Sequence, residues 1–82
     1  MKIIENNVIV MFRHEDYIIE ICKEKCMGIW GYDSYLQKEG YGIKMSMFGM
    51  DTDSCSLEEY IALVEVNLPH HIEIYEEEGY GT

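Results

Sequence analysis

The order of apolar and polar residues along the chain predicts one amphipathic helix most clearly. Ser56 and Glu59 form the S-x-x-E pattern of a capping box, which opens a helix. Pro69 indicates its end, because the residue before a proline is disfavoured in helical geometry. We therefore expect a helix over residues 57–67, with one apolar stripe made of Leu57, Tyr60, Ile61, Val64 and Leu68.

Several shorter apolar runs predict strands. Residues 8–12 are apolar on both faces, which is typical of a central strand covered on each side. Residues 32–38 and 43–48 flank the glycine-containing segment 39–42 and predict a hairpin. Two weaker runs, residues 2–4 before a turn at Asn6 and Asn7 and residues 70–75 after Pro69, complete a predicted sheet.

Residues 15–27 fit two patterns. The β-branched residues between 17 and 22 suit a strand, whereas the helical wheel places most apolar side chains of this segment in one broad arc. We expect a helix here, ended by Gly28, with Lys23 and Lys25 near the negative end of its dipole. The fold class expected is α+β, with a small antiparallel or mixed sheet of four to five strands and one or two helices packed on it. Residues 1–76 are expected to form one compact domain, followed by an acidic, glycine-containing tail at residues 77–82.

The distribution of charge is uneven along the chain. The net charge is −10, and no lysine or arginine follows Lys44, although nine carboxylates do. An apolar content of 48% indicates that this charge lies on a folded domain rather than on a disordered segment. A surface of this sign disfavours direct binding to nucleic acid or to an anionic membrane and favours a basic protein partner.

The candidate chemistry in the sequence is weak. Asp51, Asp53 and Glu59 follow part of a calcium-loop pattern, but Ser56 and Ala62 occupy the positions where that loop needs glycine and a bidentate glutamate. No nucleophile, phosphate-binding or zinc-protease motif occurs, so we expect no enzymatic activity and no cofactor. Three unevenly spaced cysteines favour free thiols in a reducing, cytoplasmic compartment, which is the host cytoplasm if the gene is phage-encoded.

In composition the chain resembles the small acidic inhibitors that phages and mobile elements make against host nucleases, some of which mimic DNA. That resemblance implies a non-catalytic protein that occupies the basic, nucleic-acid-binding surface of a partner protein or nuclease. The expected contacts are the carboxylates of the lysine-free half and two tyrosine anchors, namely Asp51, Asp53, Glu58, Glu65, Glu73, Tyr75, Glu76, Glu77, Glu78 and Tyr80.

Two alternatives remain open from the sequence. One is a metal- or ligand-binding sensor that uses Cys22, Cys26 and a histidine, since cysteines four residues apart share a face of a helix. The other is a homodimer with a structural or regulatory role. Ala62, Leu63 and Val66 support association, because they lie on the helix face opposite the apolar stripe.

Overall fold

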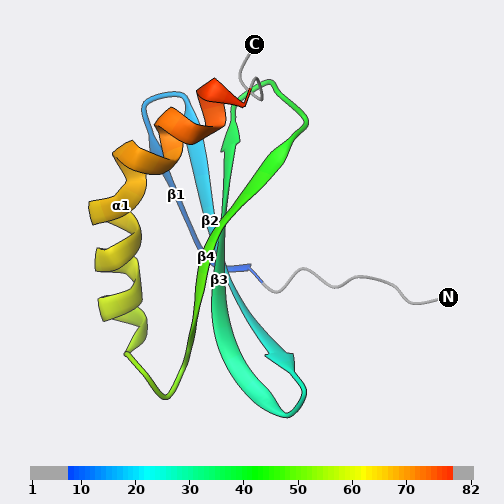
Figure 1. Cartoon of the computed structure of the whole chain (residues 1–82), viewed down its shortest axis with the longest axis vertical. Helices are drawn as coiled ribbons and strands as arrows, with labels where there is room; N and C mark the ends of the chain where they lie inside the picture. The colour runs from blue at the N-terminus through cyan, green and yellow to red at the C-terminus, as the bar shows by residue number, and fades with distance from the viewer. Residues whose placement is uncertain (1–7, 79–82) are drawn as a thin grey trace, which may run out of the picture.

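The computed structural model describes residues 8–78 of the chain. They form a four-stranded antiparallel sheet in the order β1-β2-β3-β4, with one helix packed across one face (Figure 1). The predicted α+β fold is confirmed, while the run predicted at residues 2–4 lies outside the described residues. The elements are β1 (Val8–His14), β2 (Tyr17–Cys26), β3 (Ile29–Lys38), β4 (Lys44–Asp51) and α1 (Leu57–Glu77).

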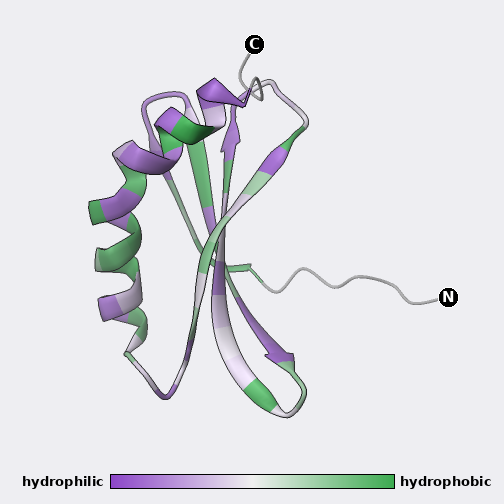
Figure 2. Ribbon diagram, in the orientation of Figure 1, coloured by the Kyte–Doolittle hydropathy of each residue, from purple (hydrophilic) through white to green (hydrophobic). Residues whose placement is uncertain are grey.

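The core lies between α1 and the sheet face that alternate residues of β2 and β3 form. Ile19, Ile21 and Leu36 are fully buried on the sheet side. Figure 2 shows both apolar and polar segments along the strands and the helix. No other element among the described residues covers the opposite face of the sheet. The helix contributes buried residues at helical spacing, namely Tyr60, Val64, Leu68 and Tyr75.

A hydroxyl pair forms the polar contact inside this core. Tyr60 Oη donates to the carbonyl oxygen of Phe48 at 2.5 Å and lies 2.9 Å from Ser34 Oγ. The register of β3 and β4 shifts nearby, between Asp33 and Tyr35, so the tyrosine bonds to backbone where the strand pairing is irregular. Burial raises the pKa of Tyr60 to about 12.

The prediction of a helix at residues 15–27 is wrong, because most of this segment forms a strand. The chain turns at Glu15, whose φ is 57°, and continues as β2. β2 pairs with β1 on one side and with β3 along its whole length on the other. Ile18 and Ile19 are neighbours in sequence and fit either periodicity, so pairing with two other strands decides the conformation.

The central position expected for residues 8–12 is also wrong, because β1 is an edge strand of the described sheet. Val10 and Phe12 pack against the core, but Ile9 is 46% exposed and Met11 is 62% exposed. One face of β1 meets the helix layer, whereas its other face belongs to the uncovered side of the sheet. The central apolar strand is β2, which buries residues on both of its faces.

The helix does not end before Pro69, and residues 70–75 do not form the expected strand. α1 continues to Glu77 with Pro69 inside it, and it changes direction in the yellow-to-orange part that contains the proline (Figure 1). The cost of the missing backbone hydrogen bond is offset by the apolar stripe, which continues to Tyr75. The Tyr75 hydroxyl donates to the carbonyl oxygen of Ile43 at 2.8 Å and accepts from the backbone N–H of Lys38 at 3.2 Å. These contacts fasten the far end of the helix to the sheet.

Candidate protein-binding surface

The outer face of α1 carries most of the unbalanced charge of the described chain. The helix starts as predicted, since Ser56 Oγ accepts from the Glu59 N–H at 3.2 Å and Glu59 Oε1 accepts from the Ser56 N–H at 2.8 Å. The buried stripe then turns all the glutamates of the helix toward solvent. These six exposed carboxylates are Glu58, Glu59, Glu65, Glu73, Glu76 and Glu77.

None of the ion pairs that residues 8–78 form neutralises the helix. Each of the three pairs lies within the strands and the turns between them, so α1 keeps its full negative charge. The pairs join Arg13 to Glu39, Lys38 to Asp16 at 4.0 Å and Lys44 to Glu20 at 2.8 Å.

The C-terminal end of α1 carries charge of the unfavourable sign. Glu76 and Glu77 lie in the last turn and Glu78 is the C-cap, with no basic residue in that turn. The helix dipole places partial negative charge there, so each carboxylate costs about 0.3–1 kcal/mol instead of stabilising the helix. Asp51, Asp53 and Glu58 differ, because they lie near the positive N-terminal end. Folding therefore explains the acidic residues at the start of the helix but not Glu77 and Glu78 at its end.

Glu76 also contacts the sheet. Its Oε2 accepts a hydrogen bond from the Tyr17 hydroxyl at 2.5 Å, and the Tyr17 ring meets the Tyr75 ring edge to face with centroids 5.7 Å apart. Burial and this carboxylate together raise the pKa of Tyr17 well above its usual value. The carboxylate of Glu76 is thereby held in place at the end of the helix.

An apolar groove lies between α1 and the segment that precedes it. Val66 is 77% exposed and Leu63 is 38% exposed on the outer face of the helix. The groove has a volume of about 460 Å³, and Glu59 stands among its otherwise mostly apolar residues. We call this hollow the helix groove; its lining residues are Met50, Ser54, Cys55, Glu59, Ala62, Leu63 and Val66.

The remaining predicted contacts are scattered. Asp51 ends β4 and lines a separate hollow of about 300 Å³ with Glu24 and Asp33, while Asp53 is exposed in the turn before α1. Tyr75 is fully buried and has no surface to offer a partner, so it anchors the helix instead. Tyr80 lies outside the described residues.

The cysteines do not share a site. Cys22 and Cys26 are four residues apart in β2 rather than in a helix, which separates their Cα atoms by about 13 Å. Cys22 is buried and Cys26 is exposed. His71 stacks on the ring of Phe48, and no group of three potential metal ligands comes together within residues 8–78.

Sequence reasoning missed a basic feature at one end of the sheet. Lys23 and Lys25 lie near the end of β2, with their Nζ atoms 5.5 Å and 5.9 Å from the centre of the Trp30 ring. They are not at the end of a helix, where the sequence placed them. The sequence contains one signal for this feature, which is that Lys23 and Lys25 stand on either side of Glu24. In a strand, such alternate residues lie on the same face.

Comparison with family models, with curated proteins and with solved structures found no match to this chain. α1, the helix that the described residues form, lacks the apolar length that a membrane crossing requires.

Proposed function

We propose that this protein is a non-catalytic inhibitor, which binds the basic, nucleic-acid-binding surface of a partner protein through the outer face of α1. The observation that carries the proposal is the row of six carboxylates along one helix, none of them in an ion pair of the described chain. Their placement extends into the last turn, where it reduces the stability of the helix. Charge kept at such a cost is typical of a binding surface.

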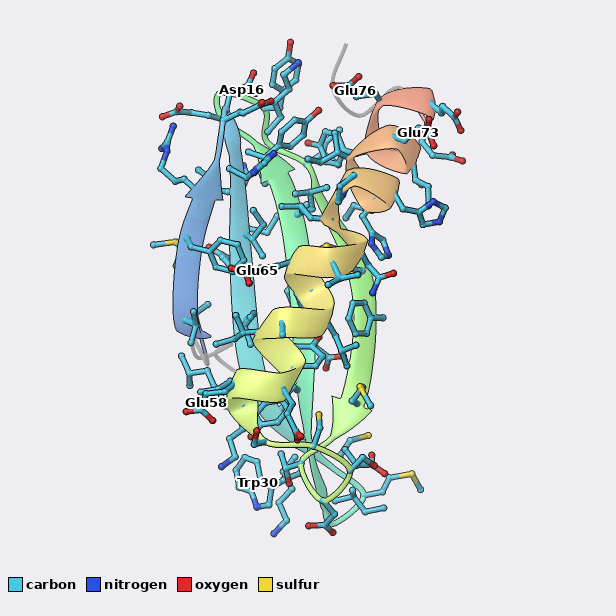
Figure 3. The ribbon with its side chains drawn as sticks, turned by 90° about the vertical axis from the view of Figure 1, so that its left-hand side faces the viewer. Asp16, Trp30, Glu58, Glu65, Glu73 and Glu76 are labelled. Carbon is cyan, nitrogen blue, oxygen red and sulfur yellow. The ribbon has the colours of Figure 1, made fainter. Side chains whose placement is uncertain are left out.

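The spacing of the carboxylates supports a partner that binds nucleic acid. Glu58, Glu65 and Glu76 are 7 and 11 residues apart, close to whole turns, so they share one flank of the helix. Figure 3 shows Glu58 and Glu65 on the flank nearer to β1, with Glu73 and Glu76 toward the other end. At 1.5 Å per residue, Glu58 and Glu65 are about 10 Å apart along the helix axis. This distance is close to the rise of about 10 Å over three phosphates of one DNA strand along the DNA axis.

The apolar residues between the carboxylates favour a protein as the partner. Val66 and Ala62 lie on the outer face among the glutamates, and Leu63 lies beside them where the helix borders the groove. Protein interfaces combine such an apolar centre with a polar rim. A partner with lysine and arginine around an apolar patch matches both parts, and the net charge of −10 accelerates its approach.

The proposal is tested by capturing proteins from a lysate of the native host on the immobilised chain. We expect to capture nucleic-acid-binding proteins rich in lysine and arginine. Adding double-stranded DNA or salt should release these proteins from the immobilised chain. The double variant Glu65→Gln/Glu73→Gln should bind the identified partner at least tenfold more weakly and with a smaller salt dependence. The matched control Glu15→Gln/Glu24→Gln changes the net charge equally but lies off the helix, and it should bind normally.

Two results would contradict the proposal. In one, DNA fails to displace the captured protein, which means that the basic nucleic-acid-binding surface is not the one occupied. In the other, both double variants lose the same affinity, which means that total charge matters and the helix face does not.

A further inference from the structure

The tip of the β2–β3 hairpin, which we call the finger (residues 23–30), is basic and apolar in an otherwise acidic protein. Lys23 and Lys25 are the two cations of the described chain without a carboxylate within 4.0 Å. Beyond Cys22 the described β2 has no β1 partner, and β3 pairs with β4 only from Gly31 onward. The end of the finger therefore lies beyond the pairing that the described residues of β1 and β4 make with β2 and β3, although the Trp30 carbonyl oxygen still accepts from the Thr52 N–H at 3.1 Å.

The end of the finger exposes apolar side chains at a cost to folding. Met27 is 95% exposed, Ile29 is 56% exposed and Trp30 is 47% exposed. Met27 also has a φ of 53° and precedes Gly28, whose φ is 83°. Tight hairpin turns with two positive φ values favour Asn-Gly, and a methionine in left-handed geometry costs about 1–2 kcal/mol. Stability and solubility would both favour asparagine at position 27, so another role explains the methionine.

The helix groove has the complementary character. It is lined by apolar side chains and has a volume of about 460 Å³, within the range of roughly 300–1,000 Å³ found for ligand pockets. Glu59 lines it, Asp53 is exposed in the loop that leads to α1, and no lysine or arginine follows Lys44 in the sequence. Its charge is therefore opposite to that of the finger.

The finger cannot fill the groove of its own chain. Figure 1 shows the hairpin tip curving away from the start of α1 at the lower end of the molecule. We propose that the finger inserts into the helix groove of a second copy, with Lys23 and Lys25 facing Asp53 and Glu59 of that copy. Each copy offers one finger and one groove, so we take the arrangement in which both contacts form about one twofold axis, which closes a symmetric dimer.

Charge explains why this contact is the favourable one between two copies. Two chains with a net charge of −10 repel each other, so association requires a place where opposite charges meet. The finger brings the two unpaired cations of the described chain to an acidic, apolar site. Burial of Met27, Ile29 and Trp30 supplies the hydrophobic part of the contact.

The experiment is sedimentation equilibrium of the isolated chain with two variants. Met27→Asn removes the apolar end of the finger and suits the turn, so its melting temperature should equal or exceed that of the wild type. Val66→Asp puts charge into the groove at an exposed position. We expect each variant to dissociate at least tenfold more readily than the wild-type dimer, whereas the control Met11→Asn, on β1, should dimerise normally.

Mixing the variants separates this contact from other ways of dimerising. An intact finger on the Val66→Asp chain can enter the intact groove of the Met27→Asn chain, so the mixture should associate more strongly than either variant alone. A monomeric wild type, or two variants that dimerise like the wild type, would overturn the proposal. Since no partner is needed, its failure leaves the proposed inhibitor function unaffected. The dimer would cover Ala62, Leu63 and Val66, which the proposed function also uses, so the finger and the inhibited partner compete for this surface. Capture by the Met27→Asn chain, whose groove stays free, tests the inhibitor function separately.

Discussion

The two ends of α1 allow the same chemical change to be made with opposite expected effects on stability. Glu58 lies in the first turn and Glu77 in the last turn, and neither is in a described ion pair. The helix dipole amounts to about half a positive charge at the N-terminus and half a negative charge at the C-terminus. Replacing Glu77 with glutamine should therefore stabilise the protein, while replacing Glu58 should destabilise it.

The magnitude follows from the position of each residue. Each exposed charge within a terminal turn contributes about 0.3–1 kcal/mol, so the unfolding free energies of Glu77→Gln and Glu58→Gln should differ by about 0.6–2 kcal/mol. Both variants remove one negative charge from −10, so the change in general repulsion cancels in the comparison. Glutamine and glutamate have similar helix propensities, which removes a second source of difference.

Urea denaturation followed by circular dichroism measures this difference. With a slope of about 1 kcal/mol per molar urea, typical of a small domain, the two midpoints should be separated by roughly 0.6–2 M. In about 1 M NaCl the Debye length falls to about 3 Å and the separation should shrink. Equal midpoints at low salt, or a Glu77→Gln variant less stable than Glu58→Gln, would refute the claim that the carboxylates at the helix end oppose folding.

The remaining predictions concern the core, the cap and the buried tyrosine. Ile19→Ala should destabilise the protein by about 2–5 kcal/mol and Ile9→Ala by much less, measured by the same urea titration, because Ile19 is fully buried and Ile9 is 46% exposed. Ser56→Ala should cost about 1 kcal/mol by removing the capping bond, seen as a melting temperature lower by about 4–8 °C. Tyr60 keeps its proton in the folded state to about pH 12, so its contribution to stability should be constant below pH 10 and fall by up to about 1.4 kcal/mol per pH unit between pH 10 and 12; Tyr60→Phe should lack this part of the loss.

Local signals in the sequence predicted the parts of the fold that local interactions determine. Ser56 and Glu59 satisfy each other across one helical turn, and the glycine-containing segment 39–42 reverses the chain between β3 and β4. Local signals could not predict the conformation of residues 15–27. Their apolar pattern fits a helix, but the pairing of β2 with β1 and β3 makes the segment a strand. The prediction that the helix ends before Pro69 failed for a related reason. The hydrogen bonds of Tyr75 with the sheet stabilise the part of the helix beyond the proline.

The candidate surface was predictable only in its charge. The exposed glutamates of α1 follow from the composition of the second half of the chain and from the buried stripe. The prediction that Tyr75 contacts a partner was wrong, because Tyr75 is fully buried. A tyrosine has an apolar ring and a polar hydroxyl, so it suits a core as well as an interface. The finger could not be foreseen while Lys23 and Lys25 were assigned to a helix, because only a strand puts both of them beside Trp30.

The continuation of the helix past Pro69 changes what the acidic residues can do together. A helix over residues 57–67 would span about 16 Å, and the later glutamates would lie on a strand and a tail. As one element of 21 residues, α1 is about 31 Å long and places Glu73 and Glu77 on the same surface as Glu58. The buried contacts of Tyr75 that extend the helix therefore also build the acidic face. Removing the ring with Tyr75→Ala should weaken both the far end of the helix and binding through that face, whereas the surface changes at Glu65 and Glu73 should affect binding alone.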